Sequence, residues 1–159
     1  MKIRFRKAVE QDVPLILDFT KQLAEYEKLS HEVTATVEIL TKSLFGPRPY
    51  AEVVFALVDS KEVGFAIFFH NFSTFVGKPG LYLEDLYVKP EYRKLGIGKA
   101  LMQYCTQMAV ERDCGRMEWW VLEWNPARKF YEQMGATPMD EWVTYRLTAD
   151  QVAKIAEGE

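Results

Sequence analysis

The stretch that decides the fold is Tyr82-Leu-Glu-Asp-Leu-Tyr-Val-Lys-Pro-Glu-Tyr-Arg-Lys-Leu-Gly-Ile-Gly-Lys-Ala100. Its first part is rich in β-forming residues and predicts a strand over 81–88. Pro90 fixes its own φ and lacks a backbone N–H, which predicts a turn. A long helix then opens at a segment that contains Gly96 and Gly98. Because a helix start carries unpaired N–H groups and partial positive charge, this arrangement predicts a site for a phosphate-bearing ligand.

Two common nucleotide loops are excluded by single residues. A Walker A loop would need Gly at position 93 and Ser or Thr at position 100, where the chain has Arg93 and Ala100. The dinucleotide fingerprint would need a third glycine at position 101, where the chain has Leu101. The pattern that remains is Arg-x-x-Gly-x-Gly-x-Ala, directly after a strand and a turn.

Length and composition bound the class of protein. The length of 159 residues predicts a single domain, 1–159. Hydrophobic residues make up 48% of the chain and aromatic residues 14%, which is enough to fill the core of such a domain. A net charge of −3 gives no basic surface suited to nucleic acid. No apolar run approaches the roughly 20 residues of a membrane span, and two cysteines with two histidines predict neither a disulfide framework nor a metal site. We therefore expect a cytoplasmic protein that binds no nucleic acid, membrane or metal.

The order of the expected elements indicates an α/β fold with one mixed sheet. After a first strand around Ile3 to Arg6, the expected elements are helices from Asp12 to about 26–29 and over 37–45, strands over 51–58, 63–72 and 81–88, a helix over about 95–113, a strand over 117–122, a helix over 127–134, a strand over 141–147 and a helix over 150–156. Three consecutive strands between helices exclude a regular Rossmann repeat, so we expect helices on both faces of the sheet. The helix crossover predicts that strands 81–88 and 117–122 are parallel.

This order and four stretches resemble the GNAT superfamily of N-acetyltransferases over nearly the whole chain. The stretches are Tyr82–Val88, Tyr92-Arg-Lys-Leu-Gly-Ile-Gly98, Trp124-Asn125 and Phe130-Tyr-Glu-Gln-Met-Gly-Ala136. More narrowly, Leu23-Ala-Glu-Tyr-Glu27, Tyr82-Leu-Glu-Asp85 and Glu123-Trp-Asn125 resemble the diamine, or spermidine/spermine, N-acetyltransferase branch. The resemblance implies the GNAT acyltransferase fold, with a central twisted mixed sheet of six to seven strands, and an enzyme that uses acetyl-CoA.

The resemblance also implies the site residues. The cofactor would be held by Leu86, Tyr87, Val88, Arg93, Lys94, Leu95, Gly96, Ile97, Gly98, Lys99, Asn125 and Arg128, and the amine substrate by Tyr26, Glu27, Glu84 and Asp85. Tyr131 would be the general acid, since a phenol of reference pKa ~10 can protonate a thiolate leaving group; packing of its ring in the core is the alternative. Glu84 would face the amine, as an ammonium ligand or as a base through water. Because neighbouring residues on a strand point to opposite faces, we expect Glu84 and Asp85 not to form one carboxylate pair.

Two departures from the branch concern the site. The interval from Asn125 to Tyr131 is six positions, one fewer than in relatives, which leaves open whether Asn125 reaches the cofactor. The loop Ser73-Thr-Phe-Val76 has Ser73 and Phe75 where the polyamine enzymes carry an acidic residue and a tryptophan. One carboxylate on the substrate side is therefore missing, which disfavours a long polyamine as substrate.

We therefore expect acetyl transfer from acetyl-CoA to a primary amine of a small diamine, polyamine or lysine-like substrate, by direct attack through a tetrahedral intermediate. The alternatives are an acetyltransferase of a protein or peptide amine, or transfer of another acyl group, and a non-catalytic acyl-CoA sensor. A homodimer that exchanges the last strand or the C-terminal segment is expected from the resemblance. Its alternative is a monomer in which the strand Trp142-Val-Thr-Tyr145 closes the sheet edge.

Overall fold

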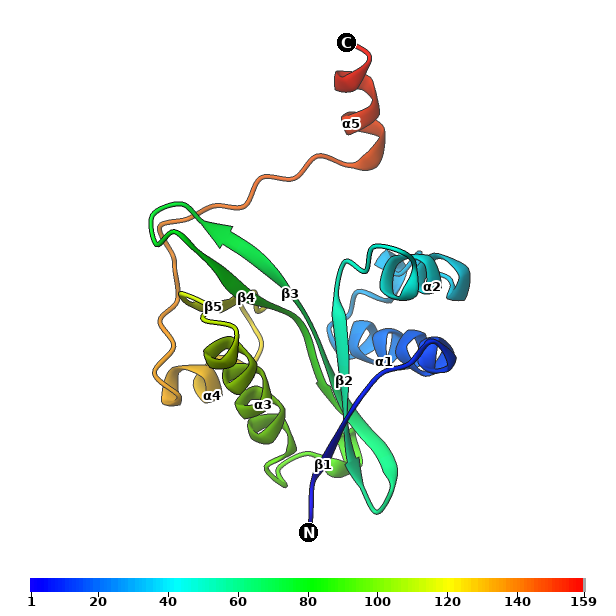
Figure 1. Ribbon diagram of the computed structural model, residues 1–159, viewed down its shortest axis with the longest axis vertical. Coiled ribbons are helices and arrows are strands. Elements are labelled where there is room, and N and C mark those ends of the chain that lie inside the picture. Colours follow the sequence, from blue (N-terminus) through cyan, green and yellow to red (C-terminus); the bar gives the residue numbers. More distant parts are fainter. Residues whose placement is uncertain (159) are drawn as a thin grey trace. The chain divides into compact units, whose positions relative to one another are not determined.

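The computed structural model describes residues 1–158, and the chain forms two compact units, Met1–Leu122 and Glu123–Glu159 (Figure 1). The first unit is built on one five-stranded sheet in the order β1-β2-β3-β4-β5. Its strands are β1 (Arg4–Lys7), β2 (Glu52–Val58), β3 (Lys61–Ser73), β4 (Lys78–Val88) and β5 (Met117–Trp119), and its α-helices are α1 (Val13–Tyr26), α2 (Val37–Phe45) and α3 (Ile97–Glu111). Short 3-10 turns occupy Glu10–Asp12, Ser30–Glu32 and Pro90–Tyr92.

The sheet is mixed, as the sequence predicts. The first four strands pair antiparallel, and β4 pairs with β5 in parallel through Leu81 opposite Met117. The connection between these two parallel strands contains α3, which confirms the expected crossover. The strand number of six to seven was wrong, because the sheet has five strands within the described residues.

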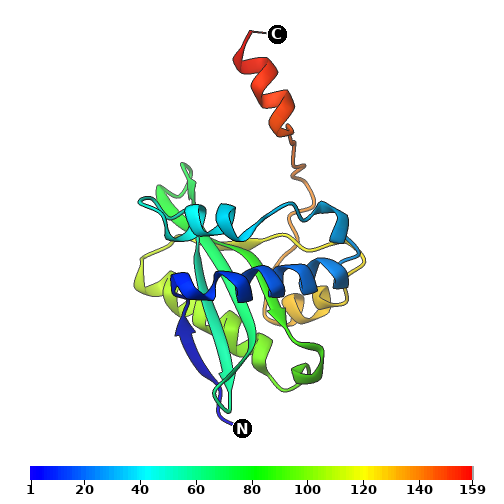
Figure 2. The ribbon, with the colours of Figure 1, turned by 90° about the vertical axis from the view of Figure 1, so that its right-hand side faces the viewer.

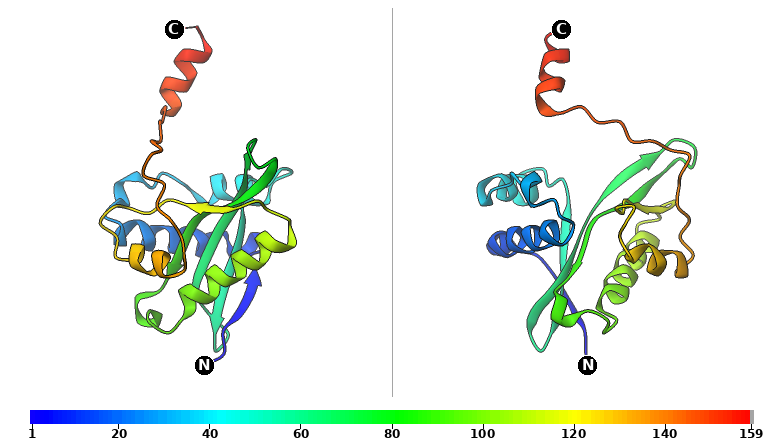
Figure 3. Two further views of the ribbon diagram at one scale, coloured as in Figure 1. Left: turned by 90° about the vertical axis from the view of Figure 1, so that its left-hand side faces the viewer. Right: turned by 180° about the vertical axis from the view of Figure 1, so that it is seen from behind.

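Helices cover both faces of the sheet in this first unit. Figure 2 shows α1 in front of the strands, and the left panel of Figure 3 shows α3 in front of the opposite face. Phe19 of α1 packs edge-on against Phe65 at 5.4 Å between ring centroids. Phe65 lies between Phe55 of β2 and Tyr87 of β4 in the strand register, so one row of rings crosses three strands on the α1 face. On α3, the buried side chains are Ile97, Leu101, Met102 and Cys105.

Several boundaries in this unit differ from the prediction. The helix expected over 95–113 spans Ile97–Glu111, because Gly96 has φ +82 and caps it in the left-handed region. The expected loop 73–79 is a tight hairpin, with β3 continuing to Ser73 and β4 starting at Lys78. Gly77 has φ +74, a conformation that suits this turn.

The second unit contains α4 (Ala127–Gln133) and α5 (Ala149–Ala156). Thr148 and Gln151 form a capping box at the start of α5. The expected strand over 141–147 was wrong, because these residues pair with no strand among residues 1–158, and each is exposed. Alternating aromatic and β-branched residues favour a strand, but a strand also needs the edge of a neighbouring strand to pair with.

Two further properties apply to the part of the chain that the structure describes. None of its helices combines the length and apolar character needed to span a bilayer. No three of its His, Cys, Asp and Glu side chains are grouped as a metal site would require.

Candidate active site

A β-bulge interrupts β4 in the middle of the sheet. Ile67 of β3 pairs with Asp85, and the next residue, Phe68, pairs with Leu83. Glu84 is therefore an extra residue of β4 that has no pairing partner on β3. Bulges of this kind bend a strand and change the direction of its side chains, and they are common beside active sites. The extra residue lies four positions before the end of β4 at Val88.

The bulge bears on the expectation that Glu84 and Asp85 do not form one carboxylate pair, which stays a prediction. That expectation rested on strict alternation along β4, which does not hold at the extra residue. The two carboxylates are close enough for the charge of Glu84 to raise the pKa of Asp85. Glu84 is exposed and Asp85 is largely buried, so they occupy different environments although they interact.

Three carboxylates gather where the bulge meets the end of α1. Burial is the main cause that raises the pKa of Asp85 to about 7, and the charges of Glu84 and Glu27 add to it. Glu27 directly follows α1, and burial also raises its pKa above the usual range. The structure therefore brings together three of the four residues expected to hold the amine. Such a cluster favours a cation in the space beside it, because the cation would relieve the repulsion.

An aromatic group beside Glu84 was missed by the sequence analysis. The ring of Tyr82 is tilted against that of Phe69 of β3 at 4.9 Å and meets Trp120 edge-on at 6.2 Å between centroids. Burial raises the pKa of Tyr82 to about 12, with smaller contributions from Glu84 and Glu118. The available signal was that Tyr82 precedes Glu84 by two positions on one predicted strand.

The helix start at α3 is open to a ligand. A Cβ added to Gly96 would meet no atom within 4 Å, and one added to Gly98 would meet only the Val88 side chain, at 4.0 Å. The turn that leads into the helix is tight, since Lys94 has φ 64 and Gly96 has φ 82. The N–H groups of the first helical turn have no partner within the helix and point toward this open space. The glycines thus fit the close approach of a pyrophosphate to the backbone, and exposed Lys94, Leu95 and Lys99 surround it.

The basic side chain expected to join that turn, Arg93, lies differently from the two lysines. Its Nε donates a hydrogen bond to the carbonyl oxygen of Val88 at 2.9 Å. Its guanidinium carbon is 4.6 Å from the ring centre of Tyr26 and 5.8 Å from that of Tyr87. The guanidinium therefore lies between the end of α1 and the end of β4.

The remaining expected residues belong to the second unit. The Asn125 Oδ1 atom accepts a hydrogen bond from the backbone N–H of Ala127, the first residue of α4, at 2.9 Å. Arg128 donates from Nη1 to the carbonyl oxygen of Glu123 at 3.1 Å. Tyr131 lies half-buried on α4, with its ring 5.5 Å from that of Phe130. Their contacts with cofactor and substrate stay predictions.

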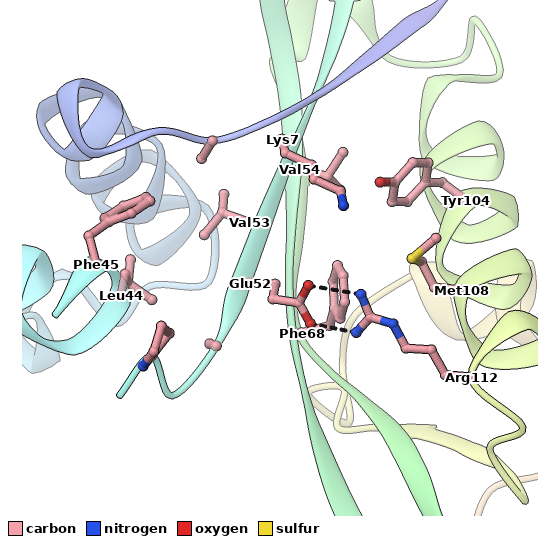
Figure 4. A pocket seen from close by; sticks show the side chains of 13 residues that line it. Lys7, Leu44, Phe45, Glu52, Val53, Val54, Phe68, Tyr104, Met108 and Arg112 are labelled. Atoms are coloured by element: carbon pink, nitrogen blue, oxygen red, sulfur yellow. Dashed lines mark hydrogen bonds and ion pairs between the residues drawn. The ribbon is translucent and has the colours of Figure 1, made fainter. Parts of the chain in front are cut away.

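A separate hollow of about 270 Å³ lies at the edge of β2 (Figure 4). Its walls are mainly apolar and include Leu44, Phe45 and Met108. Glu52 forms a two-point ion pair with Arg112 there, with N–O distances of 2.5 and 2.9 Å. This pairing lowers the pKa of Glu52, so its carboxylate is not a base for a neutral-pH reaction. The carboxylate cluster beside an open helix start is the stronger candidate.

The fold and the helix-start site define an acyltransferase architecture, and comparisons with known proteins agree. An integron cassette protein from Vibrio cholerae, of known structure, superposes with a TM-score of 0.81 at 25% identity, over 99% of both chains. Residues 18–136 match the sequence model of the Acetyltransferase (GNAT) family. The chain therefore belongs to the GNAT family of acetyltransferases, which confirms the resemblance and the fold class.

Two relatives align over nearly the full chain. A thialysine N-epsilon-acetyltransferase from Bos taurus is 33% identical, over 97% of this chain and 97% of its own length. An L-ornithine N5-acetyltransferase from Arabidopsis thaliana is 32% identical, over 96% of this chain and 87% of its own length. Both names describe acetyltransferases that act on amines, and proteins of this family use acetyl-CoA.

The raised pKa of Asp85 makes a prediction about stability. Between about pH 4 and pH 7 the folded chain holds a proton on Asp85 that the unfolded chain releases, so stability from this group is present below about pH 4 and is lost as pH rises through 7. Asp85→Asn carries no charge and should stabilise the fold at pH 8 by roughly 2–4 kcal/mol, with little gain near pH 4. Urea unfolding at both pH values measures the difference.

The matched control is Asp59→Asn, at an exposed position in the turn between β2 and β3. It should show no gain that grows with pH. A gain for Asp85→Asn that is equal at both pH values would mean that charge burial is not its cause.

Proposed function

We propose that this chain transfers an acetyl group from acetyl-CoA to the primary amine of a small lysine-like or diamine substrate. The observation that carries the proposal is the cluster of Glu27, Glu84 and Asp85. Glu84 and Asp85 lie on β4, the strand that leads to the open start of α3, and Glu27 directly follows α1. Carboxylates suit the ammonium groups of such a substrate, and a helix start suits the phosphates of the donor.

The relatives favour a lysine-like acceptor over a long polyamine. Thialysine and ornithine, which appear in the names of the two relatives, are short molecules with a terminal amine. The tip of the β3–β4 hairpin also lacks a carboxylate, with Ser73 half-buried and Phe75 94% exposed. A compact substrate can be held by the three carboxylates at the bulge without a further one at the hairpin tip.

The chain's residues have separate roles in this reaction. Bound acetyl-CoA supplies an activated acyl group, and the backbone N–H groups of residues 94–99 would hold its pyrophosphate, with Lys94 and Lys99 adding charge. Glu84 and Glu27 would hold the ammonium. Asp85, with a pKa of about 7, is matched to removing a proton from the amine near neutral pH. Tyr131 would protonate the departing sulfur, so that the proton lost by the amine is balanced by the one gained by the thiol.

Thiol release measured with acetyl-CoA and a panel of amines tests the proposal. We expect the highest kcat/KM with thialysine, lysine, ornithine or putrescine, and lower values with spermine. Turnover only on lysine-containing peptides would instead support a protein acetyltransferase. Binding of CoA without turnover on any amine would support a sensor.

Tyr131→Phe tests the general acid. Loss of the phenol proton should lower kcat by roughly 10²-fold, with a smaller effect on the KM of the amine. Tyr50→Phe, an exposed tyrosine outside the proposed site, is the matched control and should keep kcat. An unchanged kcat in Tyr131→Phe would remove Tyr131 from the mechanism.

We also propose that the chain forms a homodimer through the segment 139–147. This segment exposes five large apolar side chains, with fractional exposures of 59% for Met139, 73% for Trp142, 75% for Val143, 94% for Tyr145 and 56% for Leu147. Contiguous apolar surface of this kind usually marks an interface. A second copy could supply the strand edge that the alternating pattern of 141–147 fits.

Light scattering after size exclusion should give twice the mass of one chain. The double substitution Trp142→Glu and Tyr145→Glu should give the mass of one chain, because charge cannot be buried unpaired in an interface. A paired control, Asp150→Asn and Glu157→Gln, changes charge at exposed positions after the same segment and should leave the dimer intact. A parent chain with the mass of a monomer would exclude the proposal.

A further inference from the structure

Arg93 occupies an unusual position for a residue at the start of a phosphate-binding turn. It directly precedes Lys94, whose φ of 64 begins the tight turn into α3. Its side chain is half-buried, whereas those of Lys94 and Lys99 are exposed. The contacts of Arg93 are with the protein, at the junction of α1 and β4.

We propose that Arg93 is a positioning residue that ties the end of α1 to the end of β4, and that its guanidinium is not a ligand of the donor's phosphates. The inference rests on the proposed function, because it concerns how the donor and acceptor parts of that site are held together. It assigns the two lysines, and not Arg93, to the phosphates.

The first tie is to the strand. The Nε atom of Arg93 donates to the carbonyl oxygen of Val88, the last residue of β4. A hydrogen bond from a charged donor fixes the direction of that carbonyl, and with it the end of the strand. The strand end also belongs to the segment expected to hold the cofactor, and its distance along the chain from the phosphate-binding turn suits the pantetheine part of the donor.

The second tie is to the helix. The guanidinium lies over the ring of Tyr26, the last residue of α1, at 4.6 Å. Tyr87 of β4 reaches the same helix one turn earlier, since its hydroxyl donates to the Gln22 side-chain oxygen at 2.5 Å. Gln22 and Tyr26 are four residues apart and share one face of α1. Two adjacent contacts therefore join this face of α1 to the end of β4.

The ties matter because Glu27 follows Tyr26 directly. The charge of Glu27 acts on Asp85, so the end of α1 has to stay against the bulge for the carboxylate cluster to exist. Loss of the tie should loosen both the acceptor carboxylates and the strand end. A phosphate ligand would affect the donor's phosphates alone.

Arg93→Lys separates the two roles. Lysine keeps the positive charge, but it lacks the Nε–H at that position and the planar face that lies over a ring. We expect Arg93→Lys to raise the dissociation constant of CoA about 3- to 10-fold in calorimetric titration. We expect the dissociation constant of pantetheine, which has no phosphate, to rise by a similar factor in competition with CoA. Lys99→Ala should weaken CoA and leave pantetheine unchanged.

Tyr26 supplies an independent test of the same tie. Tyr26→Leu should weaken CoA and pantetheine as Arg93→Lys does, although Tyr26 carries no charge, and the double variant should be no worse than either single one. Tyr26→Phe keeps the ring and should lie closer to the parent than Tyr26→Leu. The matched control is Arg4→Lys, the same chemical change at an exposed position on β1.

Three results would overturn the proposal: weaker CoA binding with unchanged pantetheine binding in Arg93→Lys, unchanged CoA binding in Arg93→Lys, or unchanged CoA binding in Tyr26→Leu. Circular dichroism melts identify a variant that has lost its fold, in which case Tyr26→Leu and Tyr26→Phe decide by themselves. The titrations need no acceptor. A parent chain that binds CoA but acetylates no amine would therefore contradict the proposed function and leave the role of Arg93 measurable.

Discussion

The site depends on one extra residue in β4. Glu84 has no pairing partner on β3. At the resulting bulge, Glu84 is exposed and the adjacent Asp85 is more buried. The strand then continues to Val88 and turns into the open start of α3. In the proposed site, a single strand thus supplies acidic groups for the amine and leads directly to the helix start that would hold the phosphates. Without the bulge, regular alternation would direct one carboxylate to each face of the sheet.

This arrangement makes ionisation of Asp85 energetically unfavourable. A largely buried carboxylate beside two others is unfavourable when ionised, which is why its pKa lies near 7. The rest of the first unit offsets that cost with a closely packed row of rings, Phe55, Phe65 and Tyr87, on the α1 face of the same sheet. Tyr87 belongs both to this row and to the contact with α1, so core packing also holds the site in place.

The parts of the fold that could be predicted are those set by local sequence. Gly96, Gly98 and Pro90 act through their own backbone preferences, and the crossover rule then fixes the parallel pairing of β4 and β5. The bulge at Glu84 could not be predicted, because register depends on the facing strand β3. For the same reason the strand expected over 141–147 was wrong. The orientation of Arg93 depends on Tyr26, which is 67 positions earlier in the chain.

In the proposed reaction, the distribution of charge along β4 would let both substrates bind beside this strand. The amine is a cation and the donor's phosphates are anions. Each therefore needs side chains of opposite charge, and the two sets of side chains have to lie within a few residues of each other in the chain. Acidic groups gather at the bulge, and Lys94 and Lys99 stand beyond the end of the strand. Between them lies Arg93, whose charge faces two aromatic rings and a backbone carbonyl. If its guanidinium pointed instead toward Asp85, pairing would lower the pKa of that carboxyl and weaken it as a base. The contact of Arg93 with Tyr26 keeps the positive charge of Arg93 away from the acidic groups at the bulge.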